Sequence, residues 1–272
     1  MRGIFMTFAD HGIGQWSVLK LKFLESYLRA YLLATKTADH KYYIDCFAGL
    51  PEYTLRTSGE KVAGSSVIAL ETPGNFDEYI FIELDDERIA QLNDLRKSYP
   101  SKNISVYKGD CNREIKNILP RINKRSPIFI FLDTDGINIE WKTIEYASQW
   151  KCELLINFPF YMSIKRQMPW DENKMQQASE KSITAFYGTD TWKRILYDQY
   201  KPQQQRNNEL IHLYKNNLET LGFKYVLFSD TFTTNIGNKL YYLVFAGNHP
   251  VGATIMKHVF FKQFNVQPSL FD

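Results

Sequence analysis

Four carboxylates stand at or just after the end of an apolar run, where a parallel sheet would present them to a ligand. They are Asp45, Glu83, Asp110 and Asp133. A carboxylate accepts hydrogen bonds from both hydroxyls of a ribose, and parallel strands bring their carboxyl ends to one edge of the sheet. The sequence therefore predicts a ligand crevice at that edge, with these side chains around it.

Small residues follow the first of these carboxylates and favour a nucleoside cofactor. Gly49 ends the first run, and Gly64-Ser65-Ser66 precedes a short helical pattern. A strand, a small-residue turn and a helix let a cofactor approach backbone N–H groups at a helix N-terminus. Glu83 follows Gly64 at about the 20-residue interval expected of a ribose-binding carboxylate. As a strand-end carboxylate it is expected to bind ribose without contributing to the core; plain scaffolding and a solvated Glu remain the alternatives.

The elements that would position these residues alternate between strands and helices. Strands are predicted at 42–48, 79–85, 104–107, 128–132 and 154–156, with an antiparallel pair at 223–228 and 240–245. Helical patterns separate the first five strands, which predicts an α/β fold with a doubly wound, mostly parallel seven-stranded sheet. We expect three parts: a core over 1–160, a helical insertion over 161–221 after the fifth strand, and a closing hairpin and helix over 222–272. The polar loop 50–63 is expected to be a flap over a ligand or a mere insertion.

Composition narrows the class of protein. The 272 residues are 44% hydrophobic and carry a formal net charge of +3, so no strong global field requires a polyanionic partner. Three widely spaced cysteines predict a reducing compartment, no disulfide framework and no zinc site. No apolar run reaches about 18 residues. We expect a cytoplasmic protein with no metal and no membrane partner.

Several runs along the chain resemble the three-Cys-motif partner protein (TcmP) family over nearly its whole length. They are 43–49 (YIDCFAG), 64–66 (GSS), 81–85 (FIELD), 109–112 (GDCN), 131–136 (FLDTDG), 156–159 (INFP), 186–188 (FYG) with Trp192, and 242–245 (YLVF). The resemblance implies a class I methyltransferase-like fold, S-adenosylmethionine (SAM) as cofactor, and a separate three-Cys-motif protein as partner. It adds Phe47 and Cys111 to Asp45, Gly49, Ser65, Glu83 and Asp110 as residues expected at the cofactor.

Two departures from the family pattern leave a second function open. Leu50-Pro51 stands where Pro-Gly is expected, and Thr134-Asp135 stands where Pro and an aromatic residue are expected. A catalytically degenerate subunit that only binds SAM or a nucleotide is therefore the alternative. The missing Gly-x-Gly-x-x-Gly and the terminal hairpin disfavour a dinucleotide oxidoreductase. A DNA cytosine-5 methyltransferase would need a Pro-Cys nucleophile after the fourth strand, and none is present.

The acceptor side is predicted from two polar residues. Asp133 follows the fourth strand, and Asn157 begins the run Asn-Phe-Pro-Phe, which resembles the Asn/Asp-Pro-Pro-aromatic motif of amino-methyltransferases that act on bases. The resemblance implies catalytic roles for Asp133 and Asn157, and substrate contacts for Asp135, Pro159 and Phe160. A strand-ending turn with two core aromatics is the alternative for the second run.

The insertion predicts the kind of acceptor. Residues 161–215 hold nine Lys and Arg against six Asp and Glu, interleaved with aromatics. Such a surface suits phosphates and unstacked bases, and methyl transfer to a base requires that the base be flipped out. Lys165 and Arg166 are therefore expected to contact a nucleic acid, with an ordinary solvated face as the alternative.

Overall fold

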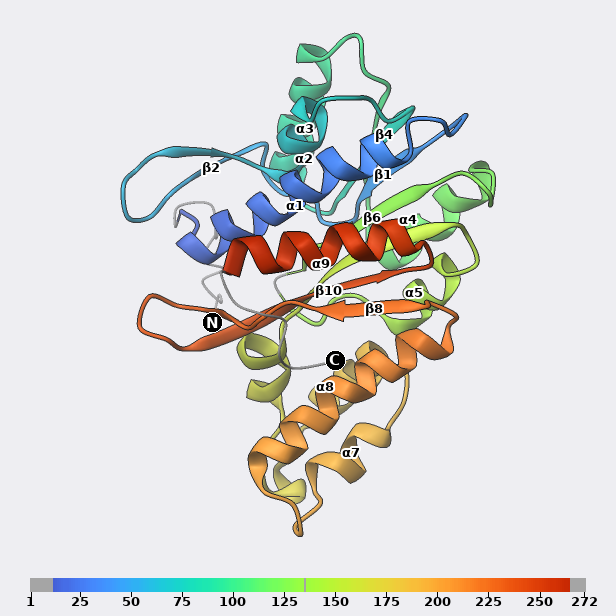
Figure 1. Cartoon of the computed structure of the whole chain (residues 1–272). Helices are drawn as coiled ribbons and strands as arrows, with labels where there is room; N and C mark the ends of the chain where they lie inside the picture. Colours follow the sequence, from blue (N-terminus) through green and yellow to red (C-terminus); the bar gives the residue numbers. More distant parts are fainter. Residues whose placement is uncertain (1–11, 135, 265–272) are drawn as a thin grey trace.

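The computed structural model describes residues 12–134 and 136–264. Its main sheet has the strand order β5-β4-β1-β6-β7-β10-β8, with the short β9 paired to β10 (Figure 1). The strands are β1 (Tyr42–Asp45), β4 (Glu78–Glu83), β5 (Ile104–Lys108), β6 (Ile128–Leu132), β7 (Cys152–Phe158), β8 (Tyr225–Phe228), β9 (Phe232–Thr233) and β10 (Lys239–Gly247). The expected doubly wound α/β architecture is confirmed.

The pairing of the strands is mostly parallel. Neighbours from β5 through β4, β1 and β6 to β7 run parallel, whereas β10 is antiparallel to β7, β8 and β9. The predicted antiparallel pair near the C-terminus therefore exists. Its later strand, β10, lies inside the sheet, and the earlier β8 forms the edge. The eighth strand is β9, which contributes two residues beside β10.

Helices cover both faces of the sheet, and Figure 1 shows α1 and α9 side by side across one of them. That face belongs to α1 (Gln15–Ala34), α2 (Ser65–Glu71), α3 (Asp86–Ser98) and α9 (Pro250–Phe264). The other face belongs to α4 (Cys111–Ile118), η2 (Leu119–Arg121), α5 (Trp141–Ala147) and the helices of the insertion. Side chains of a strand alternate between the two layers, so each apolar strand contributes to both cores.

The loop at 50–63 forms a small hairpin outside the main sheet. Its strands are β2 (Glu52–Thr54) and β3 (Lys61–Ala63), paired antiparallel. In Figure 1 the hairpin projects from the carboxyl end of β1. It is therefore an ordered structure that stands beside the predicted ligand crevice.

The insertion packs into the same core as the sheet. Its elements are the π-helical turn η3 (Phe160–Ile164), η4 (Lys165–Gln167), η5 (Glu172–Lys174), α6 (Gln177–Tyr187), α7 (Thr191–Leu196) and α8 (Gln203–Thr220). Phe186 of α6 and Tyr214 of α8 stack on each other and contact Phe158 of β7. These rings fix the insertion to the end of β7.

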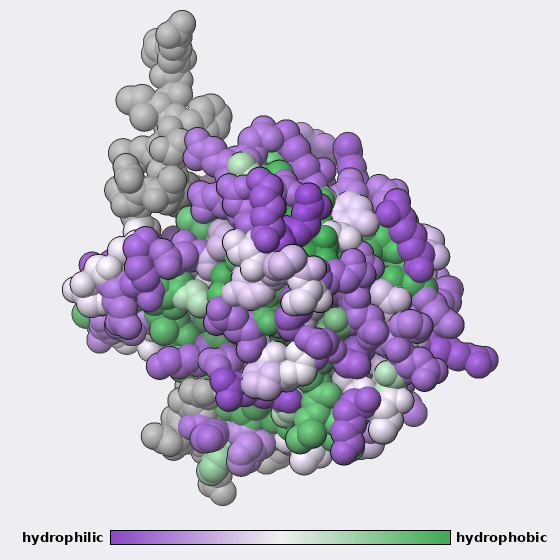
Figure 2. Space-filling model, turned by 90° about the horizontal axis from the view of Figure 1, so that it is seen from above, coloured by the Kyte–Doolittle hydropathy of each residue, from purple (hydrophilic) through white to green (hydrophobic). Residues whose placement is uncertain are grey.

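The surface seen from above is mostly hydrophilic, with apolar side chains showing between the polar ones (Figure 2). No helix in the described ranges is both long enough and apolar enough to span a membrane.

Candidate functional site

Asp45, Asp133 and Asn157 lie on one face of three adjacent strands. Asp45 is in register with Phe131 of β6, which is in register with Leu155 of β7. Side chains two residues apart point to the same face of a strand, so Asp133 and Asn157 share the face of Asp45. With Lys20 of α1, which covers this face, they form what we call the strand-end cluster.

Asp133 is the centre of this cluster. Lys20 Nζ donates to its Oδ1 over 2.5 Å, and Asn157 Nδ2 donates to the same oxygen over 3.1 Å. The Asp133 side chain is 18% exposed, and within the described ranges its Oδ2 accepts no hydrogen bond. One carboxylate oxygen is thus fixed by the protein, and the other can accept a hydrogen bond or a proton from a ligand.

Lys20 is a site residue that sequence reasoning missed. It lies on α1, is 7% exposed and has its Nζ 5.4 Å from the ring centroid of Tyr241. The available signal was its helical register, because Lys20 stands one turn before the buried Leu24 on the core-facing side of α1. A lysine at such a position requires a buried anionic partner.

Asn157 carries an unused acceptor. Its Nδ2 also donates to the Thr134 carbonyl over 3.0 Å, while its Oδ1 is buried and has no hydrogen-bond partner in the described structure. The residue is 2% exposed and lies within β7, whereas the sequence placed it after that strand. A buried acceptor without a donor is costly, so a ligand N–H or O–H would satisfy it.

Asp45 organises the turn after β1. Its carboxylate accepts hydrogen bonds from the Tyr43 hydroxyl over 3.1 Å and from the Phe47 N–H over 3.3 Å, and it also bonds to Ser65. Burial, helped by the negative charge of Asp133, raises the pKa of Asp45 to about 7 against the opposing effect of its hydrogen bonds. Asp45, Phe47 and Ser65, all expected at the cofactor, are thus brought together where the turn after β1 meets the first residue of α2.

Gly49 and Glu83 join the turn after β1 to the end of β4. The Gly49 N–H donates to Glu83 Oε2 over 2.8 Å, and the N–H groups of Leu84 and Asp85 donate to Oε1 over 2.8 and 3.0 Å. Gly49 has a φ of +61°, which favours glycine. Glu83 is 8% exposed, so the expectation that it makes no structural contribution is wrong: its carboxylate holds three backbone donors.

Tyr53 of the β2–β3 hairpin lies directly over this turn. Its hydroxyl accepts from the Leu50 N–H over 3.1 Å, and a Cβ added at Gly49 would lie 2.2 Å from the same oxygen. Burial raises the pKa of Tyr53 to about 12, with the charges of Asp133 and Asp45 adding to the shift. No local pattern in the sequence pointed to this tyrosine.

The residues of the turn after β5 mainly stabilise the fold. Asp110 is the N-cap of α4, accepting from the Asn112 N–H over 3.0 Å, and Cys111 is buried in the core. Asn112 also bonds to the loop after β6, donating to the Asn138 carbonyl over 2.8 Å and accepting from the Glu140 N–H over 2.9 Å. The capping role that the sequence allowed for Asp110 is present, and its carboxylate remains exposed to a ligand.

The other residues predicted at the acceptor are spread over different environments. Pro159 is buried, and Phe160 is fully buried and stacks on Phe158, which places it in the core. Asp135 lies outside the described residues.

Lys165 and Arg166 lie on η4, which follows η3 after the end of β7. Arg166 is exposed, and Lys165 Nζ is 5.7 Å from the ring centroids of both Tyr161 and Trp170. Burial and the nearby charge of Lys239 lower the pKa of Lys165.

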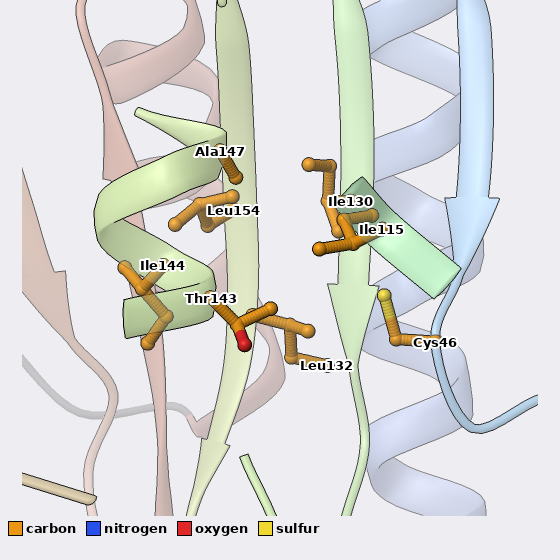
Figure 3. Close-up of a pocket in the computed structure, with 8 residues that line it drawn as sticks. All are labelled: Cys46, Ile115, Ile130, Leu132, Thr143, Ile144, Ala147 and Leu154. Atoms are coloured by element: carbon orange, nitrogen blue, oxygen red, sulfur yellow. The ribbon is translucent and has the colours of Figure 1, made fainter. Parts of the chain in front are cut away.

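A small cavity lies on the opposite face of the sheet (Figure 3). Its lining is apolar apart from Thr143 and comes from Cys46 directly after β1, from the strands β6 and β7, and from the helices α4 and α5. It has room for about one water molecule. This is a packing void rather than a ligand site. Within the described ranges no group of three or more His, Cys, Asp or Glu side chains is placed to hold a metal ion.

Comparisons with known proteins bear on the fold. No family model matches the chain, and no curated protein matches it. Protein LPL1258 from Legionella pneumophila has a similar structure, with a TM-score of 0.54 and 14% identity over 90% of this chain and 92% of that one. An O-methyltransferase from Bacillus cereus, solved in complex with S-adenosylhomocysteine (SAH), gives a TM-score of 0.45 and 13% identity over 87% and 83% of the two chains. The chain thus shares its doubly wound α/β fold with LPL1258 over almost the full length of both.

Proposed function

We propose that this chain is a methyltransferase that uses SAM. The observation that carries the proposal is Oδ2 of Asp133, which accepts no hydrogen bond from residues 12–134 or 136–264 and is held beside the β1 turn at the carboxyl ends of the central strands. In open α/β sheets ligands bind at this edge. A carboxylate fixed there by Lys20 and Asn157 has the geometry of an acid–base group rather than of a solvated surface residue.

The residues around the β1 turn fit the cofactor. Glu83 Oε2 accepts one N–H, from Gly49, and so retains acceptor capacity for a ribose hydroxyl. Asp110 has an exposed carboxylate at the neighbouring strand end. SAM supplies an electrophilic methyl group attached to a sulfonium.

The chain's own part in the reaction belongs to the strand-end cluster. Oδ2 of Asp133 takes the proton that an acceptor amine or hydroxyl loses, and Lys20 stabilises the carboxylate from the other oxygen. Oδ1 of Asn157, which has no donor in the part of the chain that the structure describes, accepts a second hydrogen bond and so orients the acceptor. Both acceptor atoms suit a group with two N–H bonds.

An exocyclic amino group of a nucleic-acid base has those two N–H bonds, and we propose it as the acceptor. The proposal includes membership of the three-Cys-motif partner family, on the sequence runs given above, and with it a separate three-Cys-motif protein as partner. The hydrogen bond between Asn157 and Asp133 supports this acceptor class, because it unites the two residues from which the sequence predicted base recognition.

A second function is favoured by the state of the crevice. Glu83 is engaged by three backbone donors, and the Tyr53 hydroxyl lies against Gly49. A crevice bridged in this way by the protein itself suits a degenerate subunit that binds a nucleotide or SAM and transfers nothing.

Asp133→Asn separates the two functions. The variant keeps an oxygen that can accept from Asn157 but loses the base. We would measure SAM binding by calorimetry, and transfer of a labelled methyl group to RNA, DNA and protein fractions. A methyltransferase should keep its cofactor affinity and lose about 10²- to 10⁴-fold in transfer rate.

Two results would decide against the proposal. Wild-type protein that binds SAM but labels no fraction would identify the degenerate subunit. Wild-type protein that neither binds nor is thermally stabilised by millimolar SAM would exclude the methyltransferase and a subunit that binds SAM, because saturating ligand must stabilise the folded state; the same titration with a nucleotide then tests the other form of the degenerate subunit.

A further inference from the structure

Three cations and two aromatic rings alternate at the junction of the insertion and β10. Lys239 Nζ lies 5.4 Å from the Tyr161 ring centroid, and Lys165 Nζ lies 5.7 Å from the centroids of Tyr161 and Trp170. Arg206 Cζ lies 5.0 Å from the Trp170 centroid. We call these five residues the cation–ring series. They come from β10, η3, η4, the loop after η4, and α8, so only the tertiary fold assembles them.

The cations of this series lack acidic partners. Other lysines of the insertion are paired, as Lys193 is with Glu180 and Lys201 is with Glu209. Within the described ranges Lys165, Lys239 and Arg206 form no ion pair. In the same ranges Arg206 donates only to the carbonyls of Leu196 and Asp198, over 3.1 and 3.3 Å. Among the described residues, therefore, no carboxylate neutralises the three positive charges of the series.

Lys165 and Lys239 are close enough to act together, because their Nζ atoms lie 5.7 and 5.4 Å from the centroid of the same ring, that of Tyr161. Lys239 contributes to the lowered pKa of Lys165, after burial. A bound anion would relieve this repulsion between the two ammonium groups. The cation–ring series should therefore bind ligands that carry several negative charges along their length.

The rings add a second preference. Trp170 is 53% exposed, so part of its ring can stack on a planar ligand. Tyr161 is partly buried and lies 6.2 Å from Tyr242, centroid to centroid. Cations beside exposed aromatics bind a chain of phosphates with unstacked bases, and a duplex offers no free base faces.

The series begins just beyond the carboxyl end of β7, the strand that carries Asn157. Tyr161 follows β7 by three residues and packs with Phe158 and Tyr242 on the face of the sheet opposite the Asn157 side chain, so the series approaches this strand end from that other face. A strand held along Tyr161 and Trp170 would pass the end of β7 and could present a base to Asp133 and Asn157.

We propose that the cation–ring series is a binding site for single-stranded nucleic acid, with Lys239, Lys165 and Arg206 at phosphates and Trp170 stacked on a base. This deepens the proposed function by naming the site that holds its acceptor. It makes Lys239, which lies outside the insertion, part of that site.

The test is equilibrium binding of the full-length protein to fluorescent single-stranded RNA and DNA of about twelve nucleotides. Anisotropy would be measured over a range of salt concentrations, without SAM. Lys165→Gln and Lys239→Gln should each weaken binding and reduce the salt slope by about one unit. Trp170→Ala should weaken binding by about five- to a hundredfold with little change of slope. Matched duplexes should bind more weakly than single strands.

Lys257→Gln is the matched control. Lys257 is exposed on α9, across the sheet from the insertion, and its substitution removes the same charge. It should bind like wild type. Thermal unfolding of each variant would verify that the fold is retained.

The outcomes separate this site from the proposed activity. Binding that depends on Lys165, Lys239 and Trp170 supports the site even if no methyl group is transferred. Absence of binding at low salt overturns it, as does equal weakening by Lys165→Gln and Lys257→Gln, even if the chain methylates another acceptor. Equal affinity for duplex and single strands also overturns it.

Discussion

The side-chain amide of Asn157 donates a hydrogen bond to Oδ1 of Asp133 over 3.1 Å, although 24 residues separate them in sequence. Each residue stands near the carboxyl end of its own strand, and β6 and β7 are parallel neighbours. From the sequence either one could have been the polar group of the acceptor site. The fold unites them, and among the described residues neither Asp133 Oδ2 nor Asn157 Oδ1 has a hydrogen-bond donor.

Removing Lys20 should destabilise the fold through Asp133. In Lys20→Met the carboxylate keeps its place but loses its cation, and breaking a largely buried pair from one side costs about 2–4 kcal/mol at this exposure. Asp133→Asn in the same background should cost much less than it does alone. Urea unfolding of the four proteins would give a coupling of about 1–3 kcal/mol. Strictly additive effects would mean that the ion pair contributes nothing.

The stability of the protein should depend on pH through Asp45. Its pKa is about 7 when folded and has the usual value of 3.8 when unfolded, so the folded state binds this proton more tightly. The stabilisation is fully present below about pH 3.8 and is lost as the pH rises to about 7.

Asp45→Asn isolates this contribution, because asparagine imitates the protonated form. The free energy of unfolding of the variant minus that of wild type should increase between about pH 5 and pH 7, by an amount on the order of a few kcal/mol. Urea unfolding at several pH values measures it. A difference that stays constant across this range would show that Asp45 is charged throughout.

Glu83→Ala should destabilise the protein by at least about 2 kcal/mol, because it leaves the N–H groups of Gly49, Leu84 and Asp85 without their acceptor. Glu87→Ala, an exposed position in the first turn of α3, should change the free energy of unfolding by less than about 0.5 kcal/mol. If both substitutions change the free energy of unfolding by the same small amount, Glu83 is a solvated residue that does not stabilise the fold.

Gly49→Ala should be destabilising for two reasons that a second substitution can separate. The φ of +61° costs a non-glycine residue about 1–2 kcal/mol, and the new Cβ would overlap the Tyr53 hydroxyl at 2.2 Å. Tyr53→Phe removes that oxygen, so it should cost less in the Gly49→Ala background than alone. If Tyr53→Phe lowers the free energy of unfolding equally in the wild-type and Gly49→Ala proteins, the Tyr53 hydroxyl does not contact residue 49 in solution.

The sequence predicted the strands well because their signal is local. The run 128–132 was found with the bounds that β6 has in the structure. Other boundaries were missed where apolar periodicity is weak. The first two turns of α8 are polar, and the three-residue strands β2 and β3 are partly exposed.

Only the residues at the strand ends of the site could be predicted from the sequence. Asp45, Glu83 and Asp133 were identified because a strand end fixes their position without knowledge of the rest of the fold. Lys20 and Tyr53 arrive from α1 and from the hairpin, and only the packing of those elements on the sheet brings them to the carboxylates. Phe160 was expected at the substrate and stacks in the core, because an aromatic residue after a strand serves either place.

The position of β10 between β7 and β8 imposes an order on biosynthesis. As the ribosome extends the chain, β8 emerges before β10, yet its partner in the main sheet is β10. Until residues 239–247 have left the exit tunnel, β7 presents an unpaired edge and β8 has no strand to join. A nascent chain stalled in that interval would expose the unpaired backbone of β7 beside the aromatic rings of the insertion. Aggregation is most favoured at this stage, and chaperone binding would be most useful there.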